Sequence, residues 1–230
     1  MINMSNTSKG RGVKGSKFWM QMIPNTGLKE EFDKIIGEEL EWLSPLEGEE
    51  KLYEEYELGS KEMTKELGIT DVSIFDFWPK RQPQWDGIAL SKDKKTLYIV
   101  EAKAHISEID SKCSASEESK KIIERAMREV HDDKYPLGDF DLWMNGYYQL
   151  GNRLTFLQKM KEKLPEFNSI GIKDVKLVLI NFTDDFTFKS EPVEVWKDHY
   201  REVFEKMTGN DDTPEDVINI FYSVKPMGNQ

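Results

Sequence analysis

The chain has few of the residues that mark disulfides, zinc sites and thiol chemistry. Of its 230 residues, one is a cysteine and three are histidines. Cys113 alone cannot form an internal disulfide, so no oxidising compartment is implied. The histidines are far apart in the sequence and no Cys-x-x-Cys pair accompanies them, which argues against structural zinc. Neither common Gly-rich phosphate loop is present. Any metal chemistry in this chain would therefore have to use carboxylates.

Long apolar runs are missing and basic charge is scarce. No uncharged stretch approaches the roughly 20 residues of a membrane span, and no hydrophobic segment near the N-terminus resembles a signal peptide. We therefore expect a soluble, cytoplasmic protein with no membrane partner. The 32 basic side chains are outnumbered by 43 acidic ones, which gives a net charge of −11. This balance argues against a broad basic surface for nucleic acid and leaves room for a local positive groove.

Basic residues without any acid among them are concentrated at the start of the chain. They are Lys9, Arg11, Lys14 and Lys17, and they lie among glycines and serines. This composition predicts a flexible basic arm over residues 1–20, which is either a solvated tail or a segment that grips phosphates. Residues 21–230 contain no internal repeat and no long linker, so we expect them to form a single domain.

Hydrophobic periodicity predicts helices and strands along the whole chain, and hence an α/β protein. Helices are expected over residues 28–43, 48–67, 116–130, 140–163 and 192–207, and strands over 72–77, 85–90, 96–104 and 175–182. The strands over 85–90 and 96–104 flank a short polar turn and predict a hairpin. Residues 213–224 combine a helix start with a segment that would also suit a strand.

Charged side chains interrupt this hairpin where its apolar segments end. Asp86 begins the first strand, and Glu101 and Lys103 end the second. Period-two alternation places Glu101 and Lys103 on one face, within reach of Asp86. Buried charges are costly unless they are paired or bind a cation, and Mg²⁺ prefers oxygen ligands. The pattern therefore predicts a metal-dependent site, and the alternative is a surface ion pair beside an Asp-Gly turn.

These segments resemble the signature of the PD-(D/E)XK phosphodiesterase superfamily, the restriction-endonuclease-like fold. The resemblance is carried by Gln82-Pro83-Gln84-Trp85-Asp86 and Glu101-Ala102-Lys103, with Pro83 displaced from the position directly before the acid. It implies an α-β-β-β-α-β core over about residues 48–182, with a central mixed sheet flanked by helices and extra N- and C-terminal helices. It also implies that Asp86, Glu101 and the Ala102 carbonyl bind Mg²⁺, which Mn²⁺ could replace. Lys103 would position or help deprotonate the attacking water.

The activity implied by the resemblance is hydrolysis of phosphodiester bonds in nucleic acid, most simply DNA. Many members of the family place a glutamate from the preceding helix near the metal. The candidates are Glu49, Glu54, Glu55 and Glu57. Glu57 is our preferred candidate and Glu49 the second, although most acids in this segment could simply be solvated. Cutting both strands of a duplex would require a homodimer. The alternative function is a non-catalytic nucleic-acid-binding or interaction module on the same fold.

Four further residues are candidates for contacts with nucleic acid. Lys80 and Arg81 directly precede the first motif, and Gln149 and Arg153 are four residues apart, so they share a helix face. Each pair could hold a phosphate or occupy ordinary polar positions. His105 lies on the same strand face as the second motif, where it is either an extra base or a histidine hydrogen-bonded at the end of the strand.

Overall fold

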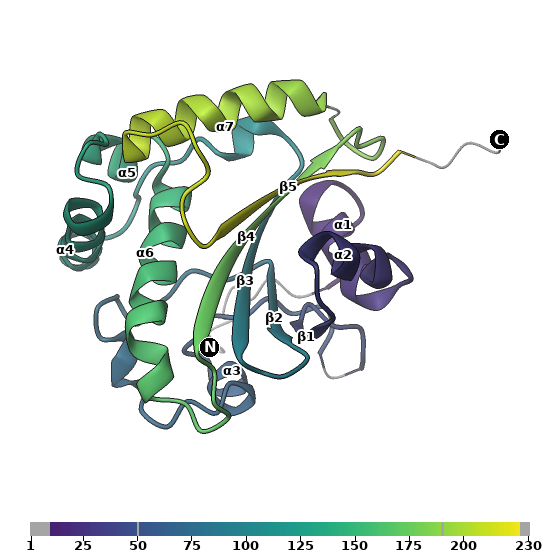
Figure 1. The fold of residues 1–230 in the computed structure, drawn as a ribbon, viewed down its shortest axis with the longest axis horizontal. Coiled ribbons are helices and arrows are strands. Elements are labelled where there is room, and N and C mark those ends of the chain that lie inside the picture. The colour runs from purple at the N-terminus through teal and green to yellow at the C-terminus, as the bar shows by residue number, and fades with distance from the viewer. Residues whose placement is uncertain (1–9, 50, 190, 226–230) are drawn as a thin grey trace, which may run out of the picture.

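A five-stranded mixed sheet forms the centre of the protein, in the order β1-β2-β3-β4-β5 (Figure 1). The structure is a computed structural model that describes residues 10–49, 51–189 and 191–225. The first three strands form an antiparallel meander, and the last two run parallel to β3. Their bounds are β1 Leu40–Ser44, β2 Gly87–Ser91, β3 Thr96–Lys103, β4 Asp174–Thr183 and β5 Val217–Ser223. The protein is thus α/β with an open mixed sheet.

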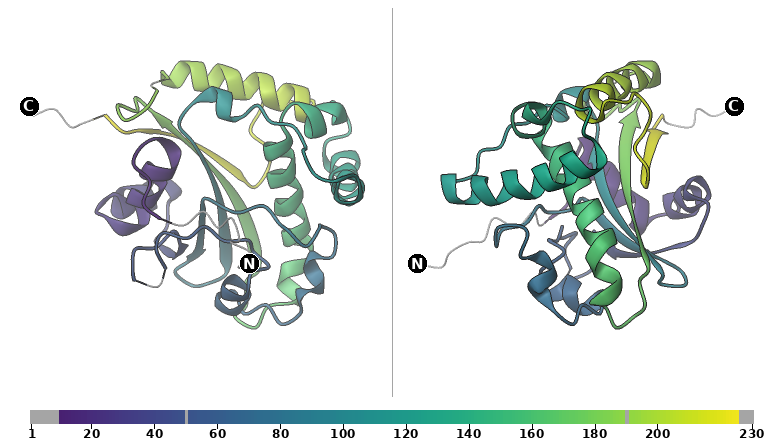
Figure 2. Two further views of the ribbon diagram at one scale, coloured as in Figure 1. Left: turned by 180° about the vertical axis from the view of Figure 1, so that it is seen from behind. Right: turned by 60° about the vertical axis from the view of Figure 1, so that its left-hand side comes forward.

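Helices cover both faces of the sheet (Figures 1 and 2). On one face lie α1 (Gly15–Asn25) and α2 (Leu28–Ile36). On the other lie α4 (Glu117–Lys134), α5 (Phe140–Asn145), α6 (Tyr148–Lys163) and α7 (Val193–Thr208). The short helices are α3 (Lys61–Glu66), η1 (Val72–Phe75), η2 (Ile106–Glu108) and η3 (Leu164–Glu166). Among the described residues, no helix is both long enough and apolar enough to cross a membrane.

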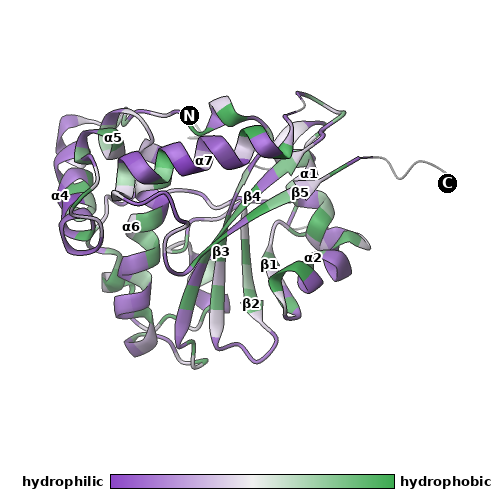
Figure 3. Cartoon of the chain, turned by 45° about the horizontal axis from the view of Figure 1, so that its top comes forward, coloured by the Kyte–Doolittle hydropathy of each residue, from purple (hydrophilic) through white to green (hydrophobic). Residues whose placement is uncertain are grey.

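Side-chain alternation along β3 divides the core between these two layers. Leu97 and Ile99 belong to the hydrophobic cluster that contains α6, whereas Tyr98 and Val100 belong to the cluster that contains α1. α7 packs through one face, and hydrophobic and hydrophilic residues alternate along its length (Figure 3). Its buried residues recur at three- and four-residue steps, as an amphipathic helix requires.

Several predicted elements are confirmed. The hairpin expected over residues 85–104 is β2 and β3, paired antiparallel from Gly87 opposite Val100. The helix expected after residue 116 is α4, whose N-cap Ser116 accepts a hydrogen bond from the Ser119 amide. The strand over 175–182 is β4, and the helix over 192–207 is α7. Of the two readings of residues 213–224, the strand is correct.

Two predicted helices are wrong over part of their length because tertiary pairing overrides the helical spacing. The helix expected over residues 28–43 ends at Gly37, whose φ of 91° forms a left-handed C-cap, and the chain continues into β1. The helix expected over residues 48–67 is confined to α3, and the chain before it is extended enough for Tyr56 to form an antiparallel bridge with Trp85.

Three other predictions also need correction. The expected strand over residues 72–77 is η1, because the Asp71 side chain caps it by accepting from the Ser73 amide at 2.8 Å. The expected helix over residues 140–163 breaks at Gly146, whose carbonyl accepts from the Ser111 amide at 2.8 Å. The expected flexible arm is wrong for residues 15–20, which belong to α1. Residues 1–9 of that arm lie outside the described residues.

Candidate active site

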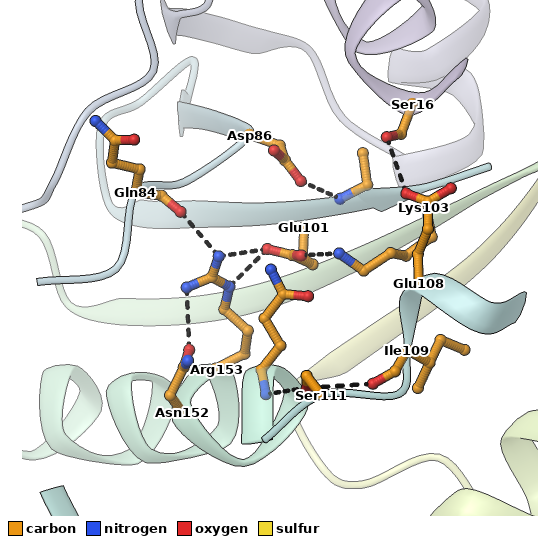
Figure 4. Close-up of polar contacts among 12 residues, drawn as sticks. Ser16, Gln84, Asp86, Glu101, Lys103, Glu108, Ile109, Ser111, Asn152 and Arg153 are labelled. Carbon is orange, nitrogen blue, oxygen red and sulfur yellow. Dashed lines mark hydrogen bonds and ion pairs between the residues drawn. The ribbon is translucent and has the colours of Figure 1, made fainter. Parts of the chain in front are cut away.

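Asp86 and the end of β3 are held together by a hydrogen bond that extends the hairpin ladder. β2 begins at Gly87, opposite Val100, so Asp86 lies across from Glu101. The Asp86 Oδ2 atom accepts a hydrogen bond from the Ala102 amide at 2.7 Å (Figure 4). The side chain thus takes the place of a strand carbonyl. This fixes the carboxyl group against the Glu101-Ala102-Lys103 segment, as the strand alternation predicted.

Glu101 lies between two cations in the interior. Its Oε1 atom accepts from the Lys103 ammonium, and its Oε2 atom accepts from Arg153 Nε at 2.6 Å. The exposed fractions of Glu101, Lys103 and Arg153 are 5%, 8% and 3%. Burial alone would raise the pKa of Glu101, but Arg153 and Lys103 outweigh it and hold that pKa below its usual value. Burial would lower the pKa of Lys103, but Glu101 and Asp86 outweigh it, and that pKa is raised.

Asp86 experiences the opposite balance. Its burial and the negative charge of Glu101 raise its pKa to about 7, and Glu55 adds to the rise. The charge on Lys103 and the Ala102 hydrogen bond oppose it without cancelling it. Burial and the neighbouring carboxylates therefore disfavour the ionised form of Asp86, and a cation bound beside it would stabilise that form.

Arg153 positions Glu101 through a set of buried contacts. Besides its bonds to Glu101, its Nη1 donates to Asn152 Oδ1 at 3.0 Å and its Nη2 to the Gln84 carbonyl at 2.8 Å. The guanidinium carbon also lies 4.4 Å from the centre of the Trp85 ring. Arg153 also lines the groove beside Asp86, and its contact with a phosphate stays a prediction.

Of the four candidate glutamates in the segment before α3, Glu55 is the one whose charge acts on Asp86, although it was not the preferred candidate. The Trp85 amide donates to the Tyr56 carbonyl at 3.0 Å, and this antiparallel bridge places Glu55 opposite Asp86. Both residues line the same groove. The preferred candidate, Glu57, lies one step further along, opposite Gln84, and burial raises its pKa while the Gln82 backbone and Arg81 oppose the rise.

The second candidate, Glu49, is exposed in a turn. Read as a strand, this segment would have placed Glu55 and Glu57 on one face and Tyr56 on the other, and this is the signal that the helical spacing concealed.

A groove of about 1090 Å³ opens beside Asp86. One wall is the irregular segment 78–84, and the other consists of the serine-rich segment 111–116 and the first turns of α4 and α6. Lys80 and Arg81 are exposed on the wall formed by segment 78–84, and Gln149 lines the groove near Asn152. Contacts of Lys80, Arg81 and Gln149 with nucleic acid stay predictions, and the groove is where such contacts would occur.

His105 is hydrogen-bonded at the end of β3, as one of the two readings proposed. Its Nδ1 atom lies 2.7 Å from Ser107 Oγ and its Nε2 atom lies 2.8 Å from Glu191 Oε1. Ser107 also donates its amide to the ring, so His105 caps η2. These contacts explain the histidine structurally.

The donor set at the hairpin end suits a hard divalent cation. Over the described ranges, no three His, Cys, Asp or Glu side chains converge closely enough to hold a metal by themselves. Two carboxylates and a backbone carbonyl, with water, are nevertheless an ordinary Mg²⁺ ligand set. Two nitrogens of Arg153 contact Glu101 Oε2, whereas only Lys103 contacts Oε1, so Oε1 keeps a lone pair with which Glu101 could bind an ion. Asp86, Glu101 and the Ala102 carbonyl therefore fit the predicted ion.

Comparison of the chain with protein-family models, with curated proteins and with solved structures found no match.

Proposed function

We propose that the chain is a metal-dependent nuclease of the PD-(D/E)XK type that hydrolyses phosphodiester bonds in DNA. The observation that carries this proposal is the meeting of Asp86, Glu101 and Lys103 at one end of the hairpin, beside an open groove. The strand order supports it, because an antiparallel meander is followed by helices and by a strand parallel to β3. This order agrees with an α-β-β-β-α-β core that begins at α2 instead of near residue 48.

Asp86 and Glu101 would hold Mg²⁺ together with the Ala102 carbonyl. Bound there, the ion would lower the pKa of a coordinated water and stabilise developing negative charge. Lys103 would supply a second positive charge beside the scissile phosphate. Glu101 and Asp86 raise the pKa of Lys103, which favours a role in positioning the water and stabilising charge. Arg153 would hold Glu101 in the orientation that the ligand role requires.

The test is Mg²⁺- and Mn²⁺-dependent cleavage of mixed single- and double-stranded DNA. Asp86→Asn, Glu101→Gln and Lys103→Met should each abolish cleavage, with circular dichroism confirming that each variant is folded. Lys206→Met is the matched control, because Lys206 is an exposed lysine of α7 that pairs with Glu202. Cleavage that persists in all three site variants would show that this site is not the catalytic centre.

A non-catalytic binding module is the second candidate function. It is favoured by the arrangement of Glu101, whose two oxygens are both engaged by Lys103 and Arg153. Titration calorimetry with Mn²⁺ separates the two functions. The nuclease predicts binding that Asp86→Asn removes, whereas the module predicts no binding in either protein.

A further inference from the structure

The loop that follows β4 presents two phenylalanines to solvent. Phe186 is 61% exposed and Phe188 is 46% exposed, and Val13 nearby in the N-terminal segment is 82% exposed. Large aromatic side chains are normally buried, so a grouped exposure of this kind marks a contact surface. We call Phe186, Phe188, Lys14 and Lys189 the aromatic platform.

The platform is held rigidly. Asp185 is 1% exposed, and its Oδ1 atom accepts from Trp19 Nε1 at 2.9 Å and from the Thr187 amide at 2.7 Å. The Gly15 amide, at the start of α1, donates to Thr187 Oγ1 at 3.0 Å. A buried acid and a helix start thus fix the loop while its rings point outward. Preorganised rings lose little conformational entropy when they bind a partner.

Two lysines lie beside the Phe188 ring. Lys14 Nζ lies 4.7 Å from the centre of the Phe188 ring, and Lys189 Nζ lies 5.7 Å from the same ring. Of the acids in the same loop, Asp184 pairs with Lys225, and Glu191 Oε1 lies 2.8 Å from His105 Nε2. Aromatic faces combined with nearby positive charge are the features that bind unpaired bases together with their phosphates.

The platform lies at the same end of β3 as the candidate active site. A Cβ atom placed on Gly15 would lie 3.9 Å from Phe188 Cδ1 and 4.0 Å from Ala104 Cβ, and Ala104 directly follows Lys103. Ala102 and Ala104 pack in the α1 cluster, whereas Glu101 reaches Arg153 on α6. The rings and the charged site are therefore on opposite faces of one strand end, a short distance apart along the chain.

We propose that the aromatic platform stacks unpaired bases of a single-stranded nucleic acid whose backbone continues to the site at Asp86. This inference rests on the proposed function and specifies its substrate class. Stacking is tolerant of sequence because every base has an aromatic face, so the platform would prefer single strands over duplexes without preferring a sequence. A duplex keeps its bases paired and stacked, and it presents no free face to Phe186 or Phe188.

Binding measured without cleavage tests the platform. The probe is a fluorescein-labelled oligodeoxythymidine, followed by anisotropy in EDTA, with the same strand in a duplex for comparison. Phe186→Ala and Phe188→Ala should each weaken single-strand binding about tenfold, since stacking on one ring contributes on that order, and should leave duplex binding unchanged. The matched control is Leu137→Ala, because Leu137 is 84% exposed in the segment between α4 and α5.

Three results would overturn the platform. The first is wild-type affinity for single strands in both alanine variants, and the second is wild-type affinity in the double variant Phe186→Leu/Phe188→Leu. The third is a dimer, detected by sedimentation, that dissociates in the alanine variants. The second result would show that apolar area suffices without an aromatic face. If the alanine variants cleaved and bound single strands as the wild type does, the platform proposal would be wrong and the nuclease proposal would stand. If the wild type bound single strands through the two rings but did not cleave them, the platform proposal would stand and the nuclease proposal would be wrong.

Discussion

Replacing Arg153 with methionine tests whether the protein holds Glu101 as a buried ion. Arg153 is 3% exposed and bonds to Glu101, to Asn152 and to the Gln84 carbonyl. Methionine replaces the aliphatic stem of arginine, so the substitution removes the charge and the hydrogen bonds of the guanidinium while keeping the packing of the stem. The group left behind is a carboxylate that is 5% exposed.

The expected loss of stability follows from that arrangement. Removing one member of a buried ion pair costs about 3–5 kcal/mol because the other charge is left uncompensated. Lys103 remains on Glu101 Oε1, so we expect a loss at the lower end, about 3 kcal/mol. Arg153→Lys keeps the charge but not the planar fork that reaches Glu101 and Gln84 together, and it should lose about 1–2 kcal/mol.

Urea unfolding at pH 7, followed by circular dichroism, measures these losses. Lys159→Met is the matched control on the same helix, because Lys159 pairs with Glu129, whose side chain is 53% exposed, and such pairs contribute about 0–1 kcal/mol. If Arg153→Met lost no more stability than this control, Glu101 would not be a buried ion held by Arg153. The role of Arg153 in positioning Glu101 would then be wrong.

Two further predictions concern pH and packing. Burial and Glu101 raise the pKa of Asp86 from 3.8 to about 7, so the folded state keeps a proton that the unfolded state has lost, and stability falls as pH rises through that window. In EDTA, the stability of Asp86→Asn relative to the wild type should therefore rise from pH 5 to pH 8. An equal difference in unfolding free energy between the two proteins at both pH values, measured by urea unfolding, would contradict this. Gly138→Ala should lose more than about 2 kcal/mol, because a Cβ there would lie 2.0 Å from the Met207 carbonyl oxygen. Gly27→Ala is the control, because a Cβ there would have open space around it. Thermal unfolding should show Gly138→Ala to be the less stable of the two variants.

The hairpin and its charged end could be predicted because their signals are local. Residues 97–100 form a continuous apolar run, and the structure buries each of them between the two helical layers. The alternation of Glu101 and Lys103 follows from strand geometry alone, and so does the reach of Asp86 to the same end. The short polar turn fixed the register of the pairing.

The remaining parts of the site depend on long-range pairing that the sequence does not display. Glu55 meets Asp86 only because Tyr56 bridges to Trp85, a contact between segments about 30 residues apart, and helical spacing over the same residues concealed it. The shared face of Gln149 and Arg153 was visible in their spacing, but nothing in that spacing shows that Arg153 faces Glu101. Phe186 and Phe188 carry no periodic signal, because a loop anchored by buried Asp185 determines their exposure.

The cost of the charged cluster bears on the choice between nuclease and binding module. A buried set of ionised side chains is often no more stabilising than apolar residues of equal volume, so Glu101, Lys103 and Arg153 are poorly explained by folding alone. Contact with nucleic acid through Lys80, Arg81 or the aromatic platform does not require them either, because Glu101 and Arg153 are almost inaccessible. Hydrolysis does require an oriented carboxylate, a protonated lysine and a second carboxylate at one point. The nuclease therefore accounts for side chains that the module leaves without a role.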